Sequence, residues 1–118
     1  MAYRNAVVRS RISDVQVTVW YFADCPNWRV GEQNLRQALD LIGRGDADVQ
    51  LMAVATEAEA AEVGFAGSPS FTVDGVDLFD APSSVGALTC RVYPTPTGFA
   101  GVPGVDDLVA VLTEKVMS

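Results

Sequence analysis

The sequence contains no histidine, and this absence excludes several classes of catalytic site. Ser–His–Asp and Cys–His nucleophilic sites, histidine general bases and histidine-containing zinc sites all need the imidazole ring. The chain has only two cysteines, Cys25 and Cys90. Two thiols are too few for a scaffold held by several disulfides or for a metal site with four thiolates. We therefore expect neither a bound metal nor a cofactor.

Basic residues are scarce as well. Eight Lys and Arg stand against 15 Asp and Glu, which gives a formal net charge of −7 at pH 7. A chain with this balance repels phosphate backbones and anionic lipids, so we expect no binding to nucleic acid or membranes. Long apolar runs are missing too, both for a bilayer span and for a signal peptide. The expected location is the cytoplasm, where thiols stay reduced.

What the sequence does contain is enough apolar material for one core. Hydrophobic residues make up 49% of the 118 residues and charged residues 19%, values typical of a single folded domain. The local patterns predict a flexible N-terminus over residues 1–14 and one domain over residues 15–118. Within that domain, residues 80–104 are rich in Pro, Gly, Ser and Thr. This composition predicts a long loop.

Periodicity predicts the elements of the first half. Residues 15–22 (VQVTVWYF) and 48–55 (DVQLMAVA) are rich in β-branched and apolar residues, which is typical of strands, the first of them central. Between them, apolar residues at helical spacing predict a helix with Pro26 at its first position and Gly43 just after its end.

The second half adds a capped helix and a hairpin. Thr56 with Glu59 forms a capping-box pattern that predicts a short helix. An Asp-Gly pair at residues 74–75 predicts a hairpin over residues 70–79. Helical spacing from Val105 onward predicts a C-terminal helix. The order β-α-β-α-β-β-α predicts an α/β domain with a mixed four-stranded sheet and helices on both faces.

Cys25 is the first candidate for chemistry. It follows the predicted central strand and precedes a helix, a position at which α/β sheets commonly form sites. A helix N-terminus favours the reactive thiolate, Arg29 would strengthen this effect and Asp24 would oppose it. The alternative is that Cys25 is a small buried residue at the start of the helix.

Two motifs then carry a family resemblance. Cys25-Pro26-Asn27-Trp28 at the strand-to-helix turn and Gly67-Ser68-Pro69-Ser70-Phe71 before the hairpin, together with the order of elements, resemble the thioredoxin superfamily. The resemblance covers nearly the whole chain. It implies a thioredoxin-like fold, a nucleophilic cysteine at Cys25, and a cis-proline at Pro69 whose backbone aligns the substrate's main chain.

A finer similarity is to small actinobacterial thioredoxin-fold proteins, sometimes labelled alkylmercury lyase-like. These share the Cys-Pro and Gly-Ser-Pro motifs and a later Cys-Arg-x-Tyr, here residues 90–93. The chain departs from dithiol oxidoreductases at Trp28, where they carry a second cysteine. Without that cysteine, the usual intramolecular release of a mixed disulfide is absent. Trp28 either packs in the core or forms a wall of the substrate groove.

Cys90 offers a replacement for the missing cysteine. In the predicted topology the chain after residue 79 returns to the edge of the site, so Cys90 could resolve Cys25, and Arg91 would help to hold a thiolate. The alternative is an unrelated thiol. The expected site thus has Cys25 and Cys90 as catalytic residues and the following residues for substrate binding: Pro26, Trp28, Ser68, Pro69 and Arg91.

These residues predict a thiol–disulfide oxidoreductase or a monothiol redox protein that acts on protein or small-molecule thiols and disulfides. The alternative from another class is a non-catalytic thioredoxin-fold binding module, which could form a homodimer through an edge strand. A minor alternative is the handling of soft metals or organomercurials by the two thiols. That alternative requires both cysteines in one pocket.

Overall fold

The structure, a computed structural model, describes residues 16–79, 88–96 and 98–117. The predicted flexible terminus and residues 80–87 of the predicted loop lie outside the described residues. The elements are β1 (Val17–Tyr21), α1 (Trp28–Leu41), β2 (Val49–Ala53), α2 (Glu57–Val63), β3 (Ser70–Val73), β4 (Val76–Asp77), β5 (Tyr93–Thr95), β6 (Gly98–Ala100), α3 (Val105–Leu112) and a π-helical segment, η2 (Thr113–Met117).

β1 lies in the interior of a four-stranded sheet with the order β2-β1-β3-β4. It pairs in parallel with β2 and antiparallel with β3, and β3 pairs antiparallel with β4. Val17 and Val19 of β1 are fully buried, as expected of β-branched residues on the covered face of a central strand. The predicted mixed four-stranded sheet and the central position of its first strand are confirmed.

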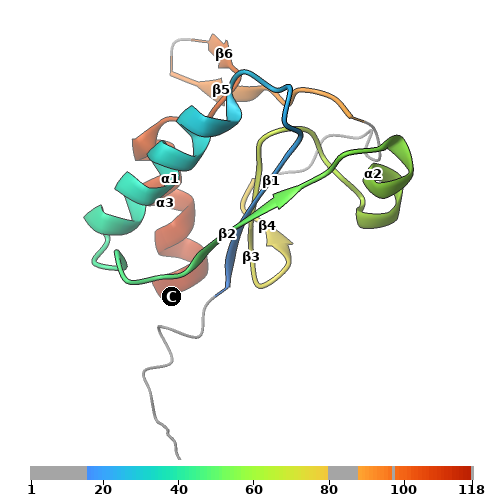
Figure 1. Cartoon of the computed structure of the whole chain (residues 1–118). Helices are drawn as coiled ribbons and strands as arrows, with labels where there is room; N and C mark the ends of the chain where they lie inside the picture. Colours follow the sequence, from blue (N-terminus) through green and yellow to red (C-terminus); the bar gives the residue numbers. More distant parts are fainter. Residues whose placement is uncertain (1–15, 80–87, 97, 118) are drawn as a thin grey trace, which may run out of the picture.

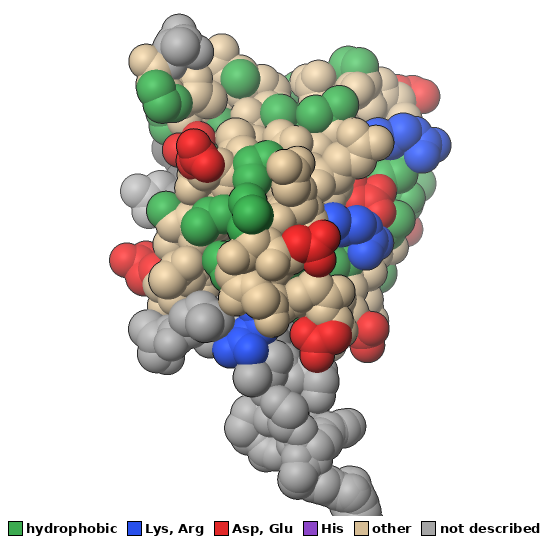
Figure 2. Space-filling model, turned by 90° about the vertical axis from the view of Figure 1, so that its left-hand side faces the viewer, with side chains coloured by type: hydrophobic (Ala, Val, Ile, Leu, Met, Phe, Trp, Pro, Cys, Tyr) green, Lys and Arg blue, Asp and Glu red, His purple; other side chains and the backbone are tan. Residues whose placement is uncertain are grey.

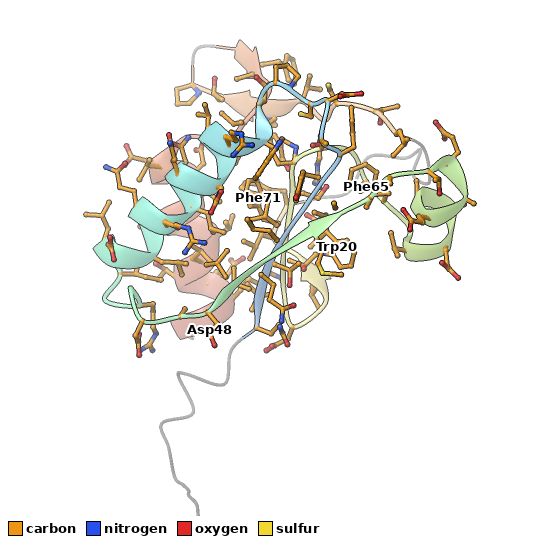
Figure 3. All side chains as sticks on the ribbon, in the orientation of Figure 1. Trp20, Asp48, Phe65 and Phe71 are labelled. Atoms are coloured by element: carbon orange, nitrogen blue, oxygen red, sulfur yellow. The ribbon has the colours of Figure 1, made fainter. Side chains whose placement is uncertain are left out.

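Helices cover the two faces of this sheet unequally. α1 and α3 pack against each other on one face, and the shorter α2 lies on the other side of the molecule (Figure 1). Phe71 of β3 belongs to the main core, together with Leu35 of α1 and Leu108 of α3. Trp20 and Phe65 lie toward α2 (Figure 3), in a second and smaller apolar cluster.

The helix boundaries follow local hydrogen bonds. The predicted capping box is confirmed, because Thr56 Oγ1 accepts from the Glu59 amide at 3.0 Å and the Glu59 carboxylate accepts from the Ala55 amide at 2.8 Å. The predicted start of α1 at Pro26 is wrong. Asn27 is its N-cap, because the preceding residues form a turn in which the Cys25 amide donates to the Phe22 carbonyl at 3.0 Å.

The predicted loop over residues 80–104 is also not uniform. β5 and β6 form a separate two-stranded antiparallel sheet inside it, in which Pro94 pairs with Phe99. Both strands of such a ribbon are edges, so a proline without an N–H group is tolerated there. Phe99 is 79% exposed, whereas Tyr93 is buried. A ribbon with so little buried apolar surface leaves little periodic signal in the sequence.

The surface of the α1 and α3 side carries both signs of charge. Figure 2 views this side and shows hydrophobic side chains lying among polar, acidic and basic ones. Across the described ranges, no helix has the length and apolar character needed to cross a membrane.

Candidate functional site

Cys25 lies just beyond the C-terminal end of β1, in the turn before α1. Its side chain is 3% exposed, although the neighbouring Asp24 and Pro26 are exposed. The Cys25 thiol donates a hydrogen bond to the Ser68 carbonyl, with a distance of 3.5 Å between Sγ and O. The turn therefore points the thiol inward, toward the segment that precedes β3.

That segment is fixed from both sides. The Ser68–Pro69 peptide bond is cis, and the Ser68 hydroxyl accepts from the Phe22 amide at 3.3 Å. α1 approaches Pro69 closely at Gly31, where an added Cβ would lie 2.9 Å from Pro69 Cγ. Only glycine leaves room for this approach. The backbone around Ser68 is consequently held in place next to Cys25.

Cys90 reaches the same backbone from a distant part of the chain. It forms an isolated parallel β-bridge with Ser68: the Ser68 amide donates to the Thr89 carbonyl at 2.8 Å, and the Arg91 amide donates to the Ser68 carbonyl at 3.0 Å. Gly67 permits this contact, because an added Cβ there would lie 2.8 Å from Arg91 Cβ. Cys90 itself is exposed.

The two thiols influence each other electrostatically. Partial desolvation raises the pKa of the otherwise exposed Cys90 thiol, and Cys25 raises it further through its charge and through a hydrogen bond between the two side chains. A neighbouring like charge disfavours a second ionisation, so the pair holds one negative charge more readily than two. The structure thus brings together the two cysteines that the sequence singled out.

Arg91 anchors the segment that carries Cys90. Its guanidinium donates to both carboxylate oxygens of Asp77, at 2.8 and 3.2 Å, and to the Ser70 hydroxyl at 3.1 Å. It also lies 4.8 Å from the centre of the Tyr93 ring, within the range of a cation–π contact. These contacts tie residues 89–91 to β3 and β4. Sequence reasoning missed Asp77, whose partner depends on the register of distant strands.

Tyr93, the last residue of the Cys-Arg-x-Tyr motif, also lies at this site, although it was not among the predicted site residues. It is 1% exposed, and its hydroxyl donates to the Pro69 carbonyl at 2.5 Å. Burial is the largest cause of its raised pKa, so the phenol stays protonated and keeps its role as donor. β5 is thereby fastened to the residue that follows Ser68.

Trp28 and Pro26 have no comparable contact with the thiols among those described. Trp28 is 7% exposed and stacks on Tyr21, with ring centres 4.0 Å apart. This favours the core-packing interpretation over a wall of an open groove. Pro26 is exposed beside Cys25.

A pocket of about 200 Å³ lies beside the Arg91 contacts, and its lining includes Trp20 and Ser70 but neither cysteine.

Within the described part of the chain, no cluster of three or more His, Cys, Asp or Glu side chains could hold a metal ion. The two thiols, the buried Ser68 carbonyl and the Arg91–Asp77 pair lie together at this site. No protein-family model, curated protein or solved structure matches this chain.

Replacing Tyr93 with Phe is expected to lower the free energy of unfolding by about 1–2 kcal/mol, because the Pro69 carbonyl loses a buried donor. Urea unfolding of the reduced protein measures this. Tyr21→Phe is the control, since ring stacking on Trp28 is retained and a change within about 0.5 kcal/mol is expected. Equal effects of the two substitutions would show that the hydroxyl of Tyr93 contributes nothing special.

Proposed function

We propose that this chain is a thiol–disulfide redox protein in which Cys25 and Cys90 cycle between two thiols and one disulfide. The observation that carries the proposal is that both cysteines meet at Ser68. The Cys25 thiol donates to the Ser68 carbonyl, and Cys90 is paired with the backbone of the same residue. The mutual influence of the thiols on the Cys90 pKa supports the same juxtaposition.

The chemistry requires a partner that accepts or supplies two electrons. When a disulfide of the form R–S–S–R oxidises the pair, the Cys25–Cys90 bond forms and the R–S–S–R bond breaks. The two protons of the cysteine thiols leave with the two R–SH products. A dithiol runs the same exchange in reverse. Protein or small-molecule thiols and disulfides in a reducing cytoplasm are the proposed partners.

Three features support a thioredoxin-like arrangement as part of this proposal. The sheet order is β2-β1-β3-β4, a cysteine follows the C-terminal end of β1, and the cis Ser68–Pro69 bond precedes β3. The proposed departure from that arrangement is the position of the second thiol. Trp28 packs on Tyr21, and Cys90 approaches from the segment before β5 instead.

Mild oxidation of the reduced chain is expected to convert it to an intramolecular disulfide. Glutathione disulfide is the oxidant, intact-mass spectrometry detects the loss of two hydrogen atoms, and peptide mapping detects a linked pair containing residues 25 and 90. Cys90→Ser is the control, because it leaves Cys25 without a partner in the chain. In this variant Cys25 should end as the free thiol or as a glutathione adduct.

The proposal fails if the folded chain yields no Cys25–Cys90 bond under conditions that oxidise a small dithiol. The alternative would then be a non-catalytic binding module. The edge strand β2, where Leu51 and Met52 are 40% and 42% exposed, would be the surface to test for pairing with a second chain.

A further inference from the structure

The two thiols differ sharply in access. Cys25 is 3% exposed, whereas Cys90 and the preceding Thr89 are exposed. Thiol–disulfide exchange requires the attacking sulfur to approach the attacked sulfur, so an accessible thiol meets an external partner first. We propose that the mixed disulfide with a partner forms on Cys90 and that the buried Cys25 resolves it. This inference rests on the proposed function and assigns roles within it.

The hydrogen bonds of the backbone next to Cys25 also favour a first reaction at Cys90. The thioredoxin resemblance leads one to expect that a substrate's main chain aligns beside Pro69. The amide and the carbonyl of Ser68 are already bonded to Thr89 and Arg91 of the chain itself. A partner peptide could use these groups only after displacing residues 89–91, which the Arg91–Asp77 ion pair holds in place. An intramolecular segment therefore occupies the Ser68 backbone groups beside Cys25.

The steps balance in both directions. In oxidation of the chain, the Cys90 thiolate attacks R–S–S–R, the S–S bond breaks, and one RS⁻ leaves and takes up the Cys90 proton. Cys25 then loses its proton, and its thiolate attacks the Cys90 sulfur and releases the second RS⁻, which takes up that proton. In reduction, one thiolate of a dithiol partner attacks the Cys90 sulfur, the Cys25–Cys90 bond breaks, and Cys25 leaves as a thiolate and takes up a proton. The partner's second thiolate then attacks the partner sulfur bound to Cys90, closes the partner's disulfide and releases Cys90, which takes up the second proton.

Two single variants test the assignment. Reduced Cys25→Ser and Cys90→Ser are mixed with glutathione disulfide, and intact-mass spectrometry follows the addition of one glutathionyl group. We expect the adduct on Cys90, in Cys25→Ser, to form at least about tenfold faster than the adduct on Cys25 in Cys90→Ser, because a buried sulfur reacts only when the chain opens. In urea the two rates should converge.

Faster or equal modification of Cys25 in the folded variants would overturn the assignment, and so would a lack of reaction at Cys90. If either variant fails to fold by circular dichroism, the wild-type chain provides the test. Brief labelling of the reduced protein with iodoacetamide, followed by peptide mapping, should find Cys90 modified first; earlier modification of Cys25 overturns the assignment. If the wild-type disulfide forms while these tests fail, the proposed function stands and only the roles change.

Discussion

A disulfide between Cys25 and Cys90 is expected to raise the free energy of unfolding by about 4 kcal/mol relative to the dithiol form. The bond would close a loop of about 65 residues, and cross-linking so long a loop removes a large amount of conformational entropy from the unfolded chain. The cost in the folded state is small if the thiols are already neighbours. Their common attachment to Ser68 provides this arrangement before oxidation.

Urea unfolding of the oxidised and the reduced wild-type chain measures this difference. The same pair of measurements on Cys90→Ser is the control, since reductant should not change the stability of a chain that cannot form the bond. An oxidised chain no more stable than the reduced one would show that the bond distorts the fold. In that case the juxtaposition at Ser68 would not be a preformed redox site.

The same free energy fixes how strongly the fold favours oxidation. The free energy by which the disulfide stabilises the folded chain equals the free energy by which folding favours formation of the disulfide, because the two quantities belong to one thermodynamic cycle. About 4 kcal/mol corresponds to a reduction potential about 90 mV more negative than that of the same two cysteines in the unfolded chain. We therefore expect a monothiol such as glutathione to reduce the Cys25–Cys90 disulfide less readily in the folded chain than in the unfolded chain.

Local chemistry in the sequence was enough to predict the sheet. β-branched density identified β1, the Thr56–Glu59 pattern identified the start of α2, and the Asp74-Gly75 turn placed β3 beside β4. Each of these signals depends on residues close together in the chain. The return of the chain after the hairpin then predicted that Cys90 approaches Cys25, and Ser68 indeed contacts both.

The remaining features depend on contacts between distant segments. Nothing near Arg91 in the sequence identifies Asp77 as its partner, because that pairing needs β4 in register and the Cys90 segment in place. The exposed fractions of Cys25 and Cys90 also depend on contacts between distant segments. The Cys25 thiol lies against the Ser68 carbonyl, a contact between residues far apart in the sequence, so its neighbours in the chain left both an activated and a buried cysteine open. The β5–β6 ribbon lacks an apolar face that a periodicity search could detect.

Replacing Asp77 with Asn is expected to lower the free energy of unfolding by about 3 kcal/mol, because it leaves a buried guanidinium opposite a neutral group. Arg91 is 5% exposed, and both of its hydrogen bonds to Asp77 involve the carboxylate oxygens. A buried charge without its counter-charge keeps the cost of leaving water and loses the compensating attraction. Urea unfolding of the reduced protein measures the loss.

Asp74→Asn is the matched control on the same hairpin. Asp74 is exposed at a positive φ that asparagine also adopts, and its side chain accepts from the Gln16 amide, a role an amide oxygen can fill. A change within about 0.5 kcal/mol is expected there. An equally small effect at Asp77 would mean that the ion pair does not hold the Cys90 segment.

The double variant Asp77→Asn with Arg91→Met separates charge from packing. Methionine fills part of the space of the arginine without carrying a charge, so the double variant should be more stable than Asp77→Asn alone.

The single variants Asp77→Asn and Asp74→Asn also test what covers Cys25. If Arg91 and Asp77 keep residues 89–91 over Cys25, the rate at which iodoacetamide labels Cys25 should rise in Asp77→Asn and stay unchanged in Asp74→Asn. Destabilisation without faster labelling of Cys25 would mean that another contact covers this thiol, and the Tyr93 hydrogen bond to Pro69 would be the next to remove.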